Sequence, residues 1–99
     1  MDEKATLVVT AVPNANEMVS VQEYLHGVLP LMTGAGGSLV RRLKTSKVVD
    51  GRPSGMVLVM DFESADAVSA MFESDEYLAL VPVRDRGFDE MNILITHEM

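Results

Sequence analysis

An arginine and an aspartate in the middle of the chain are the first residues whose side chains could do chemistry together. Arg41 and Asp61 fall in two strand-like runs that are separated by Asp50-Gly51, a strong hairpin signal. A turn that pivots about Gly51 sets Arg41 opposite Asp61, with the two side chains about 5 Å apart. The pair could be an anion-binding arginine that a carboxylate orients, or an ion pair that only fixes the strand register.

Three further side chains could contact a ligand. His26, near the end of a predicted helix, could act as a general base or interact with the helix dipole. Tyr77, the third residue after Ser74, could pack its ring beneath a helix or reach a ligand. Asn92 lies between apolar residues of a predicted strand and could point into a pocket. The predicted ligand site is His26, Arg41, Asp61, Tyr77 and Asn92, with the catalytic residues left unassigned.

Residue types exclude other classes of chemistry. The chain has no cysteine, which removes thiol nucleophiles, thiolate metal sites and disulfides. Its two histidines, His26 and His97, are too far apart in the sequence for a metal-binding motif. The glycine-rich turn at residues 34–37 lacks the Gly-Lys-Ser/Thr of a phosphate-binding loop. We therefore predict neither a metal site nor a cofactor.

The charge is acidic and unevenly distributed. A formal net charge of −7 argues against nucleic acid as a partner. Five of the eight basic residues lie between residues 41 and 52, whereas residues 61–99 are acidic. The basic stretch could steer an anionic ligand, align two subunits or keep a sheet edge soluble. We expect a cytoplasmic protein without membrane contact, because the first residues are not basic and no apolar run could span a bilayer.

Hydrophobic patterns predict an α+β fold. Apolar and β-branched runs predict four strands, at residues 5–12, 38–49, 55–63 and 90–97. Helical patterns lie between the first two strands and between the last two. This β-α-β-β-α-β order is the ferredoxin-like plan, a four-stranded antiparallel sheet with helices on one face. We expect a single domain over residues 1–99.

The helical segments have recognisable starts and stops. The first should begin near Asn14, and Pro30 should bend or end it. Its predicted buried face is Met18, Val21, Leu25, Val28 and Leu29. Ser64 and Ser74 should each cap a short helix, and Pro82 should stop the second of these.

The two inner strands are apolar on both faces. In the third strand, Leu58 and Met60 fall on one face, whereas Val57 and Val59 fall on the other. Strands of this kind must be covered on both faces, but the helical segments can cover only one. Leaving four or five large apolar side chains in water forfeits roughly 1.5–3 kcal/mol each. We therefore predict a homodimer in which a second copy packs against the open sheet face.

Several short motifs resemble a known family. They are Gly36-Gly37 followed by SLVRR, Asp61-Phe62 after an apolar strand, Ser74-Asp75-Glu76-Tyr77, and Pro82-Val83-Arg84. Together they resemble DUF1330, a family of bacterial domains of unknown function, and the resemblance implies a dimeric α+β barrel. Ala35 stands where family members often carry tyrosine, and Glu63 stands where proline is usual. No role that depends on that tyrosine carries over, and the family has no agreed activity.

Two functions fit these observations. The first is a small homodimer that binds a small apolar or anionic metabolite without catalysis. The alternative is a cofactor-independent oxygenase or isomerase acting on a small aromatic or polyketide-like metabolite, as several relatives of this fold do. In that alternative a pocket between the first helix and the sheet holds the substrate, and Arg41 or His26 places an anionic oxygen.

Overall fold

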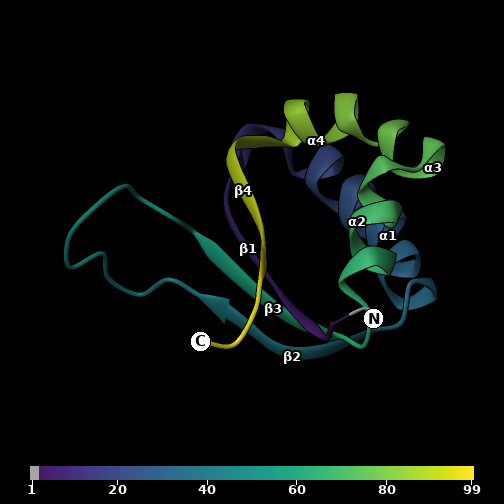
Figure 1. Ribbon diagram of the computed structural model, residues 1–99. Helices are drawn as coiled ribbons and strands as arrows, with labels where there is room; N and C mark the ends of the chain where they lie inside the picture. The colour runs from purple at the N-terminus through teal and green to yellow at the C-terminus, as the bar shows by residue number, and fades with distance from the viewer. Residues whose placement is uncertain (1–2) are drawn as a thin grey trace.

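The computed structural model describes residues 3–99, which form a four-stranded antiparallel sheet with helices on one face (Figure 1). The elements are β1 (Ala5–Pro13), η1 (Ala15–Glu17), α1 (Met18–Gly34), β2 (Gly37–Lys44), β3 (Met56–Phe62), α2 (Ala65–Glu73), α3 (Asp75–Leu78), α4 (Val81–Gly87) and β4 (Phe88–Thr96). The strand order is β2-β3-β1-β4, so β3 and β1 are the inner strands. The predicted α+β, ferredoxin-like fold is confirmed.

The inner strands turn one face to the helices and leave the other without them. Leu7 of β1 and Met60 of β3 are buried beneath the helices, at 0% and 3% exposure. The alternating residues Val8 and Val59 pair across the sheet on its other side and are half-buried. We call that side the open face. By strand register it carries Thr6, Val8, Thr10, Arg41, Val57, Val59, Asp61, Asn92 and Leu94.

The buried face of α1 is rotated from the predicted one. Its buried apolar residues are Val21, Tyr24, Val28 and Met32. Met18 and Leu29, which were predicted to be buried, are 45% and 38% exposed. The difference arises at Tyr24, whose ring packs edge-on against Phe88, with 5.6 Å between ring centroids. A tyrosine can enter a core in this way when its hydroxyl also finds a hydrogen-bond partner there.

Pro30 does not end α1, which continues to Gly34. Proline removes one helical hydrogen bond, because the carbonyl four residues earlier loses its donor. Pro30 and His26, the residue at that earlier position, are both exposed. Water can bond a free carbonyl on this side of the helix, so the helix runs past its proline.

The short helices begin where the serines predict. Ser64 Oγ accepts a hydrogen bond from the Ala67 backbone N–H at 2.9 Å, and Ser74 Oγ accepts one from the Tyr77 N–H at 3.2 Å.

The predicted role of Pro82 is wrong. It lies in the first turn of α4 instead of stopping a helix, which is a favourable position because the first helical residues need no backbone donor. Among residues 3–99, no helix has both the length and the apolar character needed to cross a bilayer.

The register between β2 and β3 differs from the predicted one. Arg41 lies opposite Val59, and Asp61 lies opposite Ser38, so the predicted Arg41–Asp61 pair is wrong. Two features explain the difference. Strand β2 ends at Lys44, which leaves a long loop at residues 45–55, and an irregularity between Leu39 and Arg41 shifts the pairing. This 45–55 loop projects away from the body of the molecule (Figure 1).

Gly87 sets how closely α4 approaches α1. A Cβ atom at this position would lie 2.9 Å from the Val21 backbone nitrogen and 3.1 Å from the Ser20 carbonyl carbon. Backbone atoms inside a helix cannot yield as the tip of a side chain can. Glycine at position 87 therefore allows the contact that brings α4, with Arg84, against the core.

We predict that Gly87→Ala lowers the free energy of unfolding by about 1–3 kcal/mol, the usual cost of overpacking. Gly34→Ala is the matched control, because a Cβ there would meet no atom within 4 Å. Alanine at position 34 should leave stability unchanged or raise it by up to about 1 kcal/mol. Urea unfolding of the two variants measures this difference, and equal losses would contradict the packing argument.

Candidate functional site

The structure does not bring the five predicted site residues together. Arg41, Asp61 and Asn92 lie on the open face, where Asn92 Nδ2 donates to Thr10 Oγ1 at 3.2 Å. His26 is exposed on α1. Tyr77 is buried within the helical layer, on the other side of the sheet.

The predicted pocket between the first helix and the sheet is almost filled by side chains. The cavity there has a volume of about 20 Å³, and its lining includes Val28, Met32 and Leu58. Space of this size holds about one water molecule, so no metabolite fits this cavity as it stands. Neither His26 nor Arg41 lines it, and the prediction that one of them places an anionic oxygen there is wrong.

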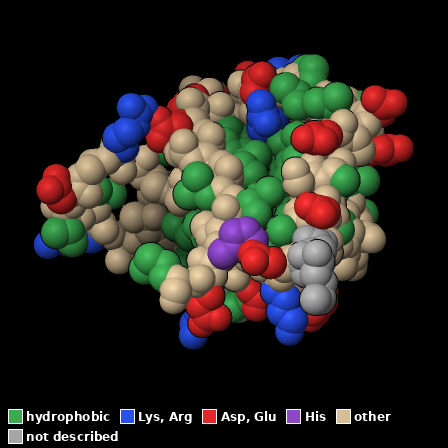
Figure 2. All heavy atoms as spheres, viewed as in Figure 1, with side chains coloured by type: hydrophobic (Ala, Val, Ile, Leu, Met, Phe, Trp, Pro, Cys, Tyr) green, Lys and Arg blue, Asp and Glu red, His purple; other side chains and the backbone are tan. Residues whose placement is uncertain are grey.

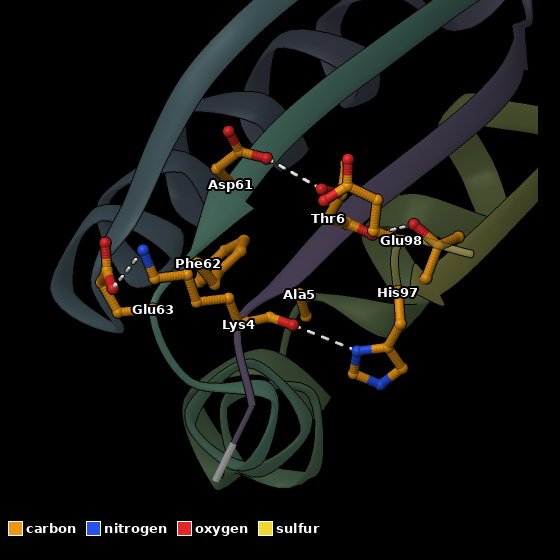
Figure 3. Close-up of a pocket in the computed structure, with 9 residues that line it drawn as sticks. Lys4, Ala5, Thr6, Asp61, Phe62, Glu63, His97 and Glu98 are labelled. Atoms are coloured by element: carbon orange, nitrogen blue, oxygen red, sulfur yellow. Dashed lines mark hydrogen bonds and ion pairs between the residues drawn. The ribbon is translucent and has the colours of Figure 1, made fainter.

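A larger pocket of about 540 Å³ lies at the end of the sheet, where Asp61 and His97 both line it (Figure 3). Several of its polar groups already have partners within the chain. Thr6 Oγ1 donates to Asp61 at 2.8 Å, His97 Nδ1 contacts the Lys4 carbonyl at 3.1 Å, and Lys4 pairs with Glu63. Within residues 3–99, no three His, Asp or Glu side chains are grouped so as to hold a metal ion. Several groups that could bind a ligand in this pocket are therefore already engaged within the protein.

A chain of hydrogen bonds inside the helical layer is the most developed polar arrangement in the molecule. The hydroxyls of Tyr24 and Tyr77 lie 2.9 Å apart and are buried. Arg84 Nη1 donates to the Tyr77 hydroxyl at 3.0 Å. Arg84 also donates to Asp85 Oδ1, from Nε at 3.2 Å and from Nη2 at 3.1 Å. This chain of hydrogen bonds runs from the core outward to the guanidinium of Arg84, whose side chain is 25% exposed.

Separate local signals position each member of this chain. The Ser74 cap starts α3 and fixes Tyr77 in its first turn, where the ring stacks edge-on against Phe72 at 4.8 Å between centroids. Pro82 starts α4 and places Arg84 two residues later. Tyr24 comes from α1, so three helices that are separate in the sequence meet at these side chains.

Burial and hydrogen bonding fix the charge states of Tyr24 and Arg84. Burial raises the pKa of Tyr24, and its bond with Tyr77 raises it further, so this hydroxyl stays protonated. Partial burial of Arg84 lowers its pKa, but the bonds with Tyr77 and Asp85 outweigh that effect and the net pKa is raised. The site thus holds a permanent cation at its outer end and the protonated hydroxyl of Tyr24 at its inner end.

Arg84 retains hydrogen-bonding capacity toward a ligand. A guanidinium has five N–H donors, and the three bonds to Tyr77 and Asp85 use one on each nitrogen. Two donors therefore remain, one on each terminal nitrogen. Two N–H groups on a planar fork match the two oxygens of a carboxylate.

Two clefts meet at Arg84, and both are also lined by Ile93 of β4. The first, of about 440 Å³, has mainly apolar walls: Phe72, Leu78, Val81, Ile93 and Ile95, with Tyr77, Ser69 and Glu73 beside them. The second, of about 480 Å³, is lined by Phe88, Met91 and Ile93 together with Asp85, Asp89 and Glu90. Figure 2 shows apolar side chains along the hollow between the sheet and the helical layer. Arg84 is thus a cation at the junction of two clefts, one of them largely apolar.

The family model for the domain of unknown function DUF1330 matches residues 5–99. The chain belongs to this family. The resemblance predicted from its short motifs is thereby confirmed. No curated protein matches the chain.

Solved structures similar to this DUF1330 protein share its fold at low sequence identity. A protein of unknown function from Rhodopseudomonas palustris has a TM-score of 0.83 at 12% identity, over 100% of this chain and 85% of that chain. A dimeric protein of unknown function with a ferredoxin-like fold, from Bacteroides fragilis, has a TM-score of 0.59 at 11% identity, over 96% of each chain. A Nitrosomonas europaea protein, provisionally described as an antibiotic biosynthesis monooxygenase, has a TM-score of 0.62 at 12% identity, over 100% and 93%.

Sequence reasoning missed two members of the site. Arg84 belongs to the Pro82-Val83-Arg84 stretch that resembles the family, but its partners come from the tertiary fold and no spacing reveals them. Tyr24 was left off the predicted apolar face of α1. The available signal was that Tyr24, Val28 and Met32 continue a helical stripe from Val21.

We predict that Tyr24 makes stability fall at alkaline pH. In the unfolded chain a tyrosine ionises near pH 10, whereas Tyr24 keeps its proton in the folded protein because its pKa is raised. Its contribution is fully present below about pH 10 and is lost as the pH rises above that value. The free energy of unfolding of the wild type should therefore fall by up to about 1.4 kcal/mol per pH unit more steeply than that of Tyr24→Phe between about pH 10 and 12. Urea unfolding across this range measures the difference, and parallel curves would contradict it.

Proposed function

We propose that this DUF1330 protein is a homodimer that binds a small apolar anion in the clefts around Arg84. One observation carries the ligand proposal: a partly buried guanidinium with two uncommitted donors lies where two clefts meet. The proposal keeps the ligand class expected from the sequence but moves the site from Arg41 and His26 to Arg84 and Tyr77.

The electrostatics of the protein favour a local site for the anion. With a net charge of −7, the molecule as a whole repels anions, so an anion needs a specific cation close by. Arg84 is that cation, and burial beside Tyr77 strengthens its interactions relative to a fully solvated arginine. The apolar wall of Phe72, Val81 and Ile93 suits an aliphatic or aromatic body attached to the anionic group. Clefts of this size are typical of small-molecule sites.

The open face supports the homodimer. Val8, Val57 and Val59 form an apolar strip on the inner strands, on the side away from the helices. Leu94 of β4, beside Val8, is 50% exposed. Packing a second copy here removes this surface from water at about 25 cal/mol per Å². The Bacteroides fragilis protein of the same fold is dimeric, which is consistent with this arrangement.

An oxygenase is the second candidate, and the fold similarity to the Nitrosomonas europaea protein favours it. A cofactor-independent oxygenase would use the anion site to hold a deprotonated substrate. Tyr24 could not remove the substrate proton near neutral pH, because its pKa is raised. Measuring dioxygen uptake after the protein is mixed with a ligand that it binds distinguishes the two functions. An oxygenase consumes dioxygen under these conditions, whereas a binding protein does not.

We predict that Val59→Lys breaks the dimer. A lysine in the middle of the open face would have to bury its charge against the second copy, at a cost of several kcal/mol. Val19→Lys is the matched control, since Val19 lies on α1 and is 82% exposed. Light scattering at micromolar concentration should give a dimer for the wild type and the control, and a monomer for Val59→Lys. A monomeric wild type would overturn the homodimer.

We predict that Arg84→Lys weakens the binding of small carboxylates by about 10-fold or more. Lysine keeps the charge but loses the planar fork, and hydrogen bonds to charged groups contribute about 1.5–3 kcal/mol. Arg86→Lys is the matched control: it is on the same helix, makes the same change and lines neither cleft. A thermal-shift screen of benzoate, 3-phenylpropanoate and octanoate selects the probe, and calorimetry measures its Kd. Equal affinities of the two variants would contradict the site.

A further inference from the structure

We propose that the ligand whose carboxylate binds at Arg84 also carries an ammonium group, and that Asp85 and Asp89 receive this group. The ligand class is then α-amino acids with an apolar side chain. The inference rests on the proposed ligand site at Arg84, and it adds a second charged group to the ligand that this site takes.

The acidic side chains around Arg84 disfavour a ligand that carries only negative charge. Among the described residues that line the two clefts, Arg84 is the one basic side chain, whereas four are acidic: Glu73, Asp85, Asp89 and Glu90. Arg84 already pairs with one of these acids, Asp85, and Arg52 pairs with Glu90. A ligand carboxylate gains from Arg84 but is repelled by the other acids and by the net charge of −7. A cationic group on the same ligand offsets this repulsion.

Asp85 presents a carboxylate oxygen beside the guanidinium of Arg84. Both hydrogen bonds between these side chains end on Asp85 Oδ1, at 3.2 Å from Nε and 3.1 Å from Nη2. In the described part of the chain, the second oxygen, Oδ2, takes part in no hydrogen bond or ion pair. The Asp85 side chain is 65% exposed, so a ligand can reach this oxygen. A donor fork and an available acceptor are therefore neighbours.

An α-amino acid has the complementary arrangement. Its carboxylate and its ammonium group are attached to the same carbon atom, so the two groups can contact a donor fork and a neighbouring acceptor together. An ammonium group has three N–H donors and no acceptor, so a bond to Asp85 leaves donors for a second carboxylate. Asp89 is exposed and lines the same cleft of about 480 Å³, and within residues 3–99 it makes no hydrogen bond or ion pair.

The side chain of the amino acid fits the other cleft. That cleft, of about 440 Å³, also contains Arg84 in its lining, and Phe72, Val81 and Ile93 belong to its apolar wall. A ligand at the junction of the clefts can thus direct its ammonium group toward the acids and its side chain toward the apolar wall. The different linings of the two clefts favour a ligand with both groups.

The test compares phenylalanine with 3-phenylpropanoate, which differ only in the ammonium group. Calorimetric titration of the wild-type protein near neutral pH should show phenylalanine binding about 3- to 10-fold more tightly, because its ammonium group pairs with partly solvated carboxylates. Asp85→Asn and Asp89→Asn should each lower this ratio of affinities by about 2-fold or more. Asp50→Asn is the matched control, because it makes the same change on the 45–55 loop and lines neither cleft. It should leave the ratio unchanged.

The ratio of affinities isolates the ammonium group, because a variant that only disturbs Arg84 weakens both probes alike. If the wild type binds 3-phenylpropanoate as tightly as phenylalanine, or more tightly, the inference is wrong but the Arg84 site stands. A ratio that neither Asp85→Asn nor Asp89→Asn lowers, or that Asp50→Asn lowers as much, also overturns the inference alone. Failure of the wild type to bind either probe, or binding that Arg84→Lys does not weaken, overturns the proposed site and this inference together.

Discussion

The bond between two tyrosine hydroxyls inside the core is the interaction on which the helical layer depends. Tyr24 belongs to the long helix α1, and Tyr77 belongs to the one-turn helix α3, which has too few residues to be stable alone. The bond and the edge-on contact of the rings, with centroids 6.3 Å apart, join these elements. Arg84 is attached to the same hydroxyl and is held in place by it. A packing interaction and a candidate binding site are therefore one arrangement.

The sheet separates two surfaces of different character, one with clefts that are open to solvent and one with apolar side chains that need to be covered. On the helical side, gaps between the helices and the edge strand β4 leave clefts that water and small molecules can enter. On the open face, valines of the inner strands need a dry neighbour to be stable. Alternation along β1 and β3 sends successive side chains to the two surfaces, so one short sequence specifies both.

Local signals in the sequence were enough to predict the four strands, the first helix and the two serine-capped helices, but not α4. Serine caps at Ser64 and Ser74 are decided by atoms within three residues, and they appear as predicted. The strands are fixed by period-two alternation, which also identified the two faces correctly. The fold class followed from the order of these elements.

The predictions that failed depended on contacts between segments that are distant in the sequence. The register of β2 depends on where the strand ends and on the irregularity after Leu39, and the Asp50-Gly51 signal does not contain that information. The apolar face of α1 depends on whether the hydroxyl of Tyr24 has a buried partner 53 residues away. Of the predicted site residues only Tyr77 belongs to the hydrogen-bonded chain, and Arg84 was missed because its partners are set by packing.

The 45–55 loop has a practical consequence. It is tied down at its base, where Thr45 donates to the Gly55 carbonyl at 3.0 Å, and by the contact of Arg52 with Glu90. Val49, at its tip, is 90% exposed. Such a loop is where a protease cuts first and where a fluorophore or affinity tag can be inserted with the least disturbance. The two pieces of a cut chain would stay together, because β2 and β3 remain paired along their length.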